Sequence, residues 1–354
     1  MLWVALELPA LPLQLVERAQ ETSLPLVIGE GPAQRPVVAC ANAAAREAGV
    51  REGMAVAAAR VLAVDLKCID RDEAAERESL ERLAGWAVQF TPCVCLEPTG
   101  LVLEVAASLR LFGGLAKLLS VLRDGIRALG LQATLGIAPT PLAARTFARA
   151  RARGIRTRSC AQMAELPARL AGLPLFLLEW PGRALEHLTD LGLVRVKDAL
   201  ALPRGGFSQR FGPEALAMLD RLAGRVPDPR IAYVPPARYR ARLELPAEAE
   251  GVEAIVFPLK RLLAEMEGTL RGRGAGRLSE AHERAATRGL QVFARRCALV
   301  GVTDAVLARV ARPFPVEPIR TLDAVHLATA ETLDEPPALV TIVTRDARVR
   351  DNAR

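Results

Sequence analysis

Residues 99–114 read TGLVLEVAASLRLFGG, an apolar run that ends in two glycines and predicts a strand followed by a tight turn. LAKLLSVLRDGIRALG (115–130) places apolar residues at helical spacing and predicts an amphipathic helix. A further strand is predicted in LQATLGIAPT (131–140), and a further helix in PLAARTFARARARG (141–154). The same alternation starts at LWVALEL (2–8). It indicates an α/β layer structure over residues 1–165.

The pattern changes after residue 165. Short helices separated by proline and glycine predict a compact helical unit over residues 166–228. A proline-rich stretch, VPDPRIAYVPPARYR (226–240), predicts an extended tether. Residues 229–277 are expected to hold this linker, one strand and one long helix. Residues 278–354 begin a new helical pattern and end in a predicted strand, which makes this an α/β multidomain chain.

Composition places the chain among globular proteins. It has 354 residues, of which 51% are hydrophobic and 25% charged, and this excludes a disordered or collagen-like chain. The net charge is +7, and nearly all basic residues are arginine, which suits phosphate partners. The alternative explanation of the high arginine content is the codon bias of a GC-rich genome. Scattered cysteines predict free thiols without structural zinc, and the lack of an apolar run of transmembrane length and of a basic leader predicts an unprocessed, cytoplasmic protein.

Two basic segments are candidate DNA contacts. The first lies in residues 141–158, where the arginines have no acidic neighbour, and the second is a glycine turn between two predicted helices, with a further arginine downstream. The alternatives are a solvated charged face and a plain helix–helix turn. The predicted contacts are Arg145, Arg149, Arg151 and Arg153 in the first segment, and Gly192, Arg195, Lys197 and Arg210 in the second.

The order of several blocks resembles the Y-family (UmuC-type) translesion DNA polymerases, and more narrowly their catalytically silent ImuB-like branch. The blocks are VVACANAAAREAGVREGMAVAAARVLAVDLK, LVLEVAASLRLFGG, TLGIAPTPLAARTFARA and LGLVRVKDALALPRGGFSQRFG. The resemblance covers about residues 1–275. It implies a palm with inserted fingers in residues 1–165, a helical thumb in 166–228 and a truncated little finger.

The resemblance also locates the positions of polymerase chemistry. Two metal ions would need carboxylates there, because the metals neutralise charge on the attacking and leaving oxygens. The family's acids would stand at Ala5, Thr99 and Gly100, so none of the three is an acid. The nearby acids Glu7, Glu97 and Glu104 do not restore the motif.

A non-catalytic role therefore follows from the resemblance. It implies a nucleoid-associated, DNA-binding accessory protein of damage-induced (SOS-type) mutagenesis that requires no cofactor. The implied partners are damaged or primer-template DNA, a RecA-like protein, the sliding clamp and an error-prone replicative-type polymerase subunit. The nearest match to a clamp-binding peptide, Gln291 to Phe293, lacks the expected spacing.

The tail resembles a different family. SEAHERAATRG (279–289), LDAVHLATA (322–330) and TRD (344–346) are similar to the C-terminal half of VapC-type PIN-domain ribonucleases. In that family acidic residues hold Mg²⁺ or Mn²⁺, which activates water for RNA cleavage. The resemblance implies metal ligands at Asp323, Asp346 and Glu280. The family's first strand, with its leading aspartate, has no counterpart in this chain.

Two alternatives stay open for the tail. Asp323 can act as a helix cap and Asp346 as a turn residue, with no metal. The tail is then a vestigial half-domain or part of a non-functional fusion. A toxin-like, metal-dependent ribonuclease is the second functional hypothesis.

Overall fold

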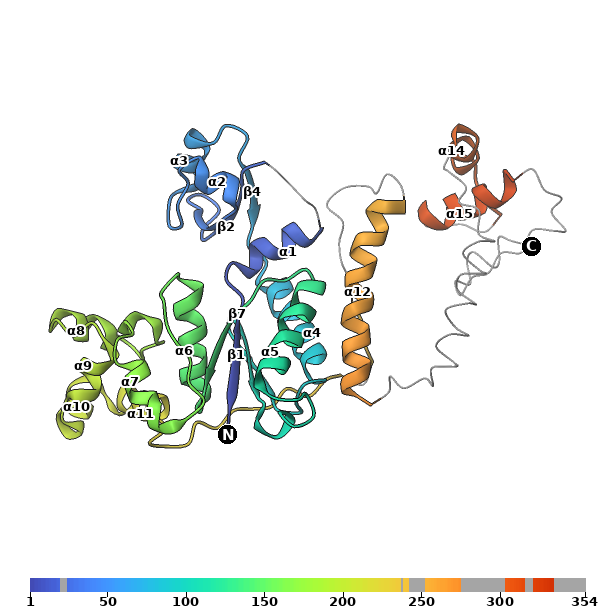
Figure 1. Ribbon diagram of the computed structural model, residues 1–354. Coiled ribbons are helices and arrows are strands. Elements are labelled where there is room, and N and C mark those ends of the chain that lie inside the picture. Colours follow the sequence, from blue (N-terminus) through green and yellow to red (C-terminus); the bar gives the residue numbers. More distant parts are fainter. Residues whose placement is uncertain (20–23, 237, 242–251, 275–302, 316–320, 334–354) are drawn as a thin grey trace. The chain divides into compact units, whose positions relative to one another are not determined.

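The computed structural model describes residues 1–19, 24–236, 238–241, 252–274, 303–315 and 321–333 (Figure 1). The chain divides into two compact units, Met1–Arg277 and Leu278–Arg354. Among the helices that the structure describes, none combines the length and apolar content that crossing a bilayer requires.

A four-stranded antiparallel sheet forms the centre of the first unit. Its strand order is β5 (Val94–Glu97), β6 (Gly100–Glu104), β1 (Trp3–Glu7) and β7 (Thr134–Ala138). Ala5 lies opposite Val102 on one side and Gly136 on the other. Every residue of β1 is buried, which explains why its sequence, WVALE, is nearly all apolar.

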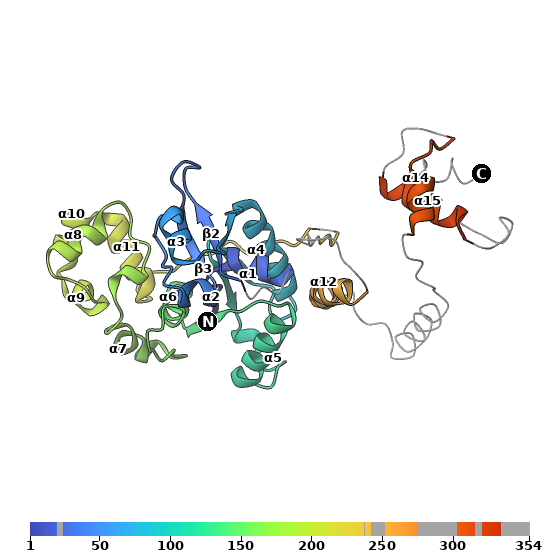
Figure 2. The same cartoon turned by 90° about the horizontal axis from the view of Figure 1, so that it is seen from above.

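Helices cover both faces of this sheet (Figures 1 and 2). On one face, α4 (Glu73–Ala87) and α5 (Leu115–Ala128) pack with Val4, Leu6 and their neighbours. On the other, α6 (Pro141–Ala152) packs against Ala5 and Val102 through Phe147. Thr140 caps α6 by accepting from the Ala143 amide.

Gly136 lets α6 approach β7 closely. A Cβ atom there would lie 2.0 Å from the Ala144 carbonyl oxygen and 2.4 Å from the Ala148 amide nitrogen. Both atoms belong to the helix backbone, so any side chain at position 136 would push α6 away from the sheet.

A smaller subdomain is inserted between β1 and α4. It contains α1 (Leu11–Ala19), the sheet β3 (Val37–Ala41), β2 (Leu26–Glu30) and β4 (Lys67–Asp70), and the helices α2 (Ala43–Glu47) and α3 (Val56–Leu62). The buried Asn42 side chain joins them, since its Oδ1 accepts from the amides of Leu26 and Ala45. This amide is satisfied internally, as a buried polar group must be.

Short helices form the next subdomain. They are η2 (Met163–Glu165), α7 (Leu166–Leu170), η3 (Leu175–Leu177), α8 (Ala184–Asp190), α9 (Val196–Ala201), α10 (Arg204–Phe211) and α11 (Pro213–Leu222); a further short helix, η1 (Ala106–Ser108), follows β6. Their apolar residues share one core with α6, so the helical subdomain packs on the palm face that α6 covers.

An ion pair joins α10 to α11 in this subdomain. Arg204 donates two hydrogen bonds to Asp220, one of them at 2.7 Å. These hydrogen bonds, with the charges of Arg204 and Arg225, hold the pKa of the Asp220 carboxyl below its usual value, against burial, which raises it.

Acidification is expected to remove this stabilisation. The native pKa lies below that of an unfolded aspartate, about 4, so Asp220 stabilises the fold above that pH and loses its contribution as the pH falls through the native pKa. Asp220→Asn should lower the free energy of unfolding at pH 7 and have little effect near pH 2. Urea unfolding of both proteins from pH 7 to pH 2 checks this, and a pH-independent difference would contradict it.

The linker and α12 (Val252–Gly272) complete the described part of the first unit. Tyr233 donates its amide to the Val94 carbonyl at 2.7 Å, so the linker follows the outer edge of β5. Helix α12 packs against α4, where Gly268 contacts Trp86. The long helix predicted for residues 229–277 is confirmed, whereas the strand predicted before it lies mostly outside the described residues.

The second unit is described over two helices. These are α14 (Asp304–Val310) and α15 (Thr321–Glu331), which pack around Val306, Phe314 and Leu327. Arg309 contributes an ion pair with Glu331 and lies 4.2 Å from the centre of the Phe314 ring. The strand predicted at the end of the tail lies outside the described residues.

Candidate functional site

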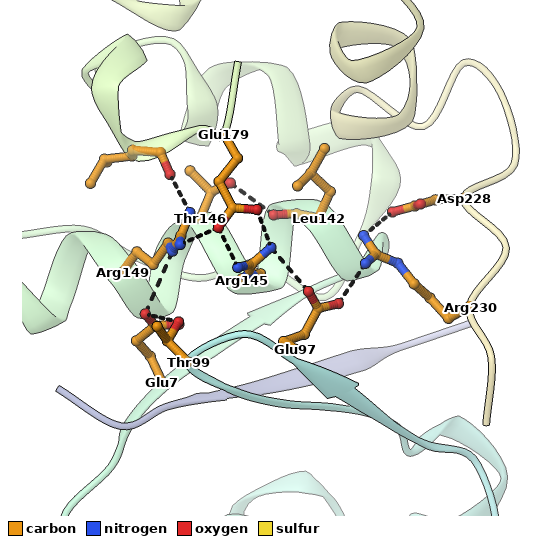
Figure 3. A network of polar contacts seen from close by, with 11 residues as sticks. Glu7, Glu97, Thr99, Leu142, Arg145, Thr146, Arg149, Glu179, Asp228 and Arg230 are labelled. Carbon is orange, nitrogen blue, oxygen red and sulfur yellow. Dashed lines mark hydrogen bonds and ion pairs between the residues drawn. The ribbon is translucent and has the colours of Figure 1, made fainter. Parts of the chain in front are cut away.

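A network of charged side chains lies between the central sheet and α6 (Figure 3). Side chains alternate across a strand, so Glu7 and Glu97 project from the same sheet face as Ala5. On α6, Arg145 and Arg149 are four residues apart and therefore share one helix face. That face is turned towards the two carboxylates.

Glu97 lies between two arginines. Its Oε2 is 3.0 Å from Nη1 of Arg145, and its Oε1 is 2.5 Å from Nη1 of Arg230 in the linker. The side chains of Arg145 and Glu97 are 6% and 5% exposed, so this pair is inside the protein. Arg230 also contacts Asp228 at 2.8 Å, which neutralises its charge further.

Glu179 joins the helical subdomain to α6. It accepts from Arg145 at 2.6 and 2.9 Å and from Arg149 at 2.6 Å. Arg149 also donates to the Leu177 carbonyl at 3.2 Å. Two arginines of α6 thus hold the loop after η3 against the palm.

Glu7 occupies the end of β1 in this network. Its Oε1 accepts a hydrogen bond of 2.6 Å from the Thr99 hydroxyl and lies 3.5 Å from Nε of Arg149. The β5–β6 hairpin and β1 meet here, since Glu7 is paired in register with Gly100. Glu104 lies at the opposite end of β6, where its carboxylate accepts from the Leu2 amide at 3.0 Å.

The two carboxylates nearest Arg145 have opposite pKa shifts. Burial raises the pKa of Glu97, and the charges of Arg145 and Arg230 oppose that shift only in part. Burial also raises the pKa of Glu179, but hydrogen bonds and charges from Arg145 and Arg149 outweigh it, and the net shift is downward. Glu179 is the more exposed carboxylate and keeps its charge more easily.

Sequence comparison finds similarity between part of this chain and a known family of domains. Residues 13–149 match the impB/mucB/samB family. Protein ImuB of Caulobacter vibrioides is 32% identical over 270 residues, which are 75% of this chain and 57% of that protein. DNA polymerase IV of Dehalococcoides mccartyi is 32% identical over 214 residues, 56% of this chain and 52% of that protein. The chain therefore spans little more than half the length of these relatives.

Structure comparison agrees with the match. The alignment with a solved Y-family DNA polymerase chimera covers 65% of this chain and 70% of the chimera, with a TM-score of 0.52 at 17% identity. At this identity the likeness concerns the fold. This chain has a Y-family polymerase fold. The central sheet with its helices is the palm, and the inserted sheet carries the fingers.

The metal pair that the Y-family fold implies does not fit the residues present. Ala5 has no donor atom and is 1% exposed in the core. A Cβ atom at Gly100 would lie 1.8 Å from the Leu6 carbonyl oxygen, so the hairpin leaves no room for an acid there. Glu7 and Glu97 are engaged by arginine. Within the described residues, no three metal-binding side chains converge on one point.

The predicted DNA contacts on α6 separate into three groups. The prediction is wrong for Arg145, because its guanidinium is buried and bound to Glu97 and Glu179. Arg149 is mostly buried in the same network, and half-buried Arg151 donates to the Leu135 carbonyl at 2.5 Å. Arg153 is exposed, so a phosphate contact there stays a prediction.

The turn at Gly192 differs from its prediction. The glycine adopts the expected positive φ of 75°. The amides of residues 192–197 are all bound internally, however, since Asp198 accepts from those of Val194 and Arg195, and carbonyls accept the others. An open backbone site for phosphate is therefore absent from these six residues. The side chains of Arg195, Lys197 and Arg210 are exposed and remain candidate contacts.

The predicted metal ligands of the tail are not brought together by the described structure. Asp323 lies in the first turn of α15, while Asp346 and Glu280 lie outside the described residues, as does the Gln291 segment. A Mg²⁺ or Mn²⁺ site at these acids stays a prediction.

Sequence analysis misses the charged members of the network that lie outside the sheet and α6. Glu7 and Glu97 were noticed as nearby acids, but Glu179 and Arg230 carried no signal. They lie 34 and 85 positions after Arg145, in a loop and a linker, with no pattern that links them to α6.

Proposed function

We propose that this chain is a DNA-binding accessory protein of translesion synthesis, which belongs to the DNA damage response, and that its palm is not catalytic. The observation that carries the proposal is the arginine-filled palm site. Arg145, Arg149 and Arg230 pair with the carboxylates at the place where a Y-family polymerase would hold metal ions.

The electrostatic argument concerns which cations the carboxylates hold. Nucleotidyl transfer needs metal ions at the attacking and leaving oxygens, and each ion needs oxygen ligands. A guanidinium can balance the charge of a carboxylate, but it supplies no Lewis acid and activates no nucleophile. The arginines also fix α6, the linker and the helical subdomain to the palm, so the site serves structure.

DNA binding needs none of the missing acids. Phosphate contacts supply most non-specific affinity, and basic side chains can make them on any surface. Exposed Arg195, Lys197 and Arg210 give the helical thumb such a surface. The similarity to protein ImuB supports a role in damage tolerance. The RecA-like protein, the sliding clamp and the replicative-type polymerase subunit are proposed partners on the same basis.

The two halves of the proposal predict binding without extension. The full chain should bind labelled primer-template DNA, and the logarithm of its binding constant should fall linearly with the logarithm of the salt concentration. With Mg²⁺ or Mn²⁺ and all four deoxynucleoside triphosphates, it should not extend the primer. Fluorescence anisotropy and gel electrophoresis measure the two results.

An active Y-family polymerase, assayed in parallel, is the control for extension. Extension by this chain that survives further purification would overturn the non-catalytic half. Failure to bind DNA even at low salt would overturn the DNA-binding half, and the two results are independent of each other.

A further inference from the structure

A second arginine cluster lies at the carboxyl end of α6, apart from the palm network. Arg151, Arg156 and Arg158 line an open depression of about 640 Å³, together with Gly154, Ile155 and Thr157. Arg151 is two positions beyond Arg149, and residues two apart do not share a helix face. It turns instead to the outer strand of the sheet, where it donates to the Leu135 carbonyl.

The segment after α6 presents its arginines in a regular way. From residue 155 to residue 159, half-buried and exposed positions alternate, and Arg156 and Arg158 are the exposed ones. The Ser159 hydroxyl accepts from the Ile137 amide at 3.0 Å, and the Cys160 amide donates to the Ile137 carbonyl at 3.1 Å. The end of the segment therefore lies beside β7, and the alternating exposure before it is typical of an extended chain.

This cluster lacks negative charge. In the part of the chain that the structure describes, no carboxylate lies within ion-pair distance of Arg151, Arg156 or Arg158. Burial, and then the charge of Arg123 on α5, lower the pKa of the Arg151 guanidinium. Arg123 lines a second depression, of about 330 Å³, with Arg127. Like charges held together without counter-charges attract an anion.

We propose that this cluster binds successive phosphates of a DNA strand. The proposal rests on the DNA-binding function proposed above. Two side chains on the same side of an extended segment lie about 6.6 Å apart, which is comparable with the spacing of neighbouring phosphates along a strand. Arginine binds phosphate oxygens in a bidentate manner. Arg151 forms the floor of the site and holds the segment against β7.

The test compares two double substitutions in the full chain. Arg156→Ala with Arg158→Ala removes the exposed pair, whereas Arg77→Ala with Arg110→Ala removes two exposed arginines elsewhere in the palm. Binding of labelled primer-template DNA is measured by fluorescence anisotropy over a salt series. Thermal unfolding checks that both variants fold as the parent does.

The first variant should bind DNA about tenfold more weakly, and its slope of log affinity against log salt should be smaller by about 2, since each phosphate contact contributes about 0.9. The second should bind like the parent. Arg156→Lys with Arg158→Lys should keep most of the salt slope, because lysine retains the charge.

Equal binding by the parent and the Arg156/Arg158 alanine variant would overturn this inference and leave the proposed function intact. A calorimetric titration with inorganic tripolyphosphate tests whether the cluster instead binds a small polyphosphate. If the parent binds tripolyphosphate through this cluster while both alanine variants bind DNA as the parent does, the assignment to a DNA strand is wrong. No DNA binding by the parent would overturn the proposed function as well.

Discussion

Replacing Arg145 by alanine is expected to lower the free energy of unfolding by about 3 kcal/mol, the lower end of the range for breaking a buried ion pair, because the buried Glu97 carboxylate loses one of its two arginine partners. Glu97 would keep only Arg230, and Glu179 only Arg149. Most of the loss should come from Glu97, because its side chain is 5% exposed whereas that of Glu179 is 52% exposed. Urea unfolding at pH 7 measures the change.

Two variants control for this effect. Arg183 pairs with Glu186 on the surface, and Arg183→Ala should cost far less than Arg145→Ala. Adding Glu97→Gln to Arg145→Ala removes a buried carboxylate whose only remaining arginine partner is Arg230, and it should recover part of the lost stability. A loss below about 1 kcal/mol for Arg145→Ala would show that the network is not a buried structural unit.

Gly100→Ala is expected to destabilise the palm by about 3 kcal/mol, the upper part of the usual range for overpacking. The added Cβ would lie 1.8 Å from the Leu6 carbonyl oxygen and 2.9 Å from its carbonyl carbon. Both atoms belong to the backbone of the central strand, so no side-chain rotation can relieve the clash. Urea unfolding again measures the loss.

The matched control is Gly206→Ala in α10. No atom lies within 4 Å of the added Cβ there, and the position is helical, so alanine should raise the stability by about 0.4–1 kcal/mol. Equal effects at positions 100 and 206 would contradict the packing argument.

The same clash bears on catalysis. Restoring acids at positions 5, 99 and 100 together should not give primer extension, because the acid at position 100 must displace β1 and the acid at position 99 would face Glu7. Extension by this triple variant would show that the backbone adapts more than the packing indicates.

The palm site also explains how the first unit is held together. Glu179 comes from the loop after η3, Arg230 from the linker and Arg145 from α6 (Figure 3). Three segments that follow the sheet in the chain are thus attached to one sheet face by charge pairs.

Much of the architecture was predictable from local patterns. Apolar runs and helical spacing predicted the palm strands and helices, including β6, α5, β7 and α6, because burial on one or two faces leaves a periodic signal. The family resemblance added that Ala5, Thr99 and Gly100 stand at the positions of the polymerase acids.

The sequence by itself determined the alternating α/β order of the palm and the long helix before the tail, because each depends on neighbouring residues. Only the tertiary structure decided which role each arginine of α6 has. Identical residues on α6 became part of a buried ion pair (Arg145), a bridge to the helical subdomain (Arg149) and the floor of a basic depression (Arg151). Their partners, Glu97, Glu179 and the Leu135 carbonyl, are distant in the chain, and long-range pairing leaves no periodic signal.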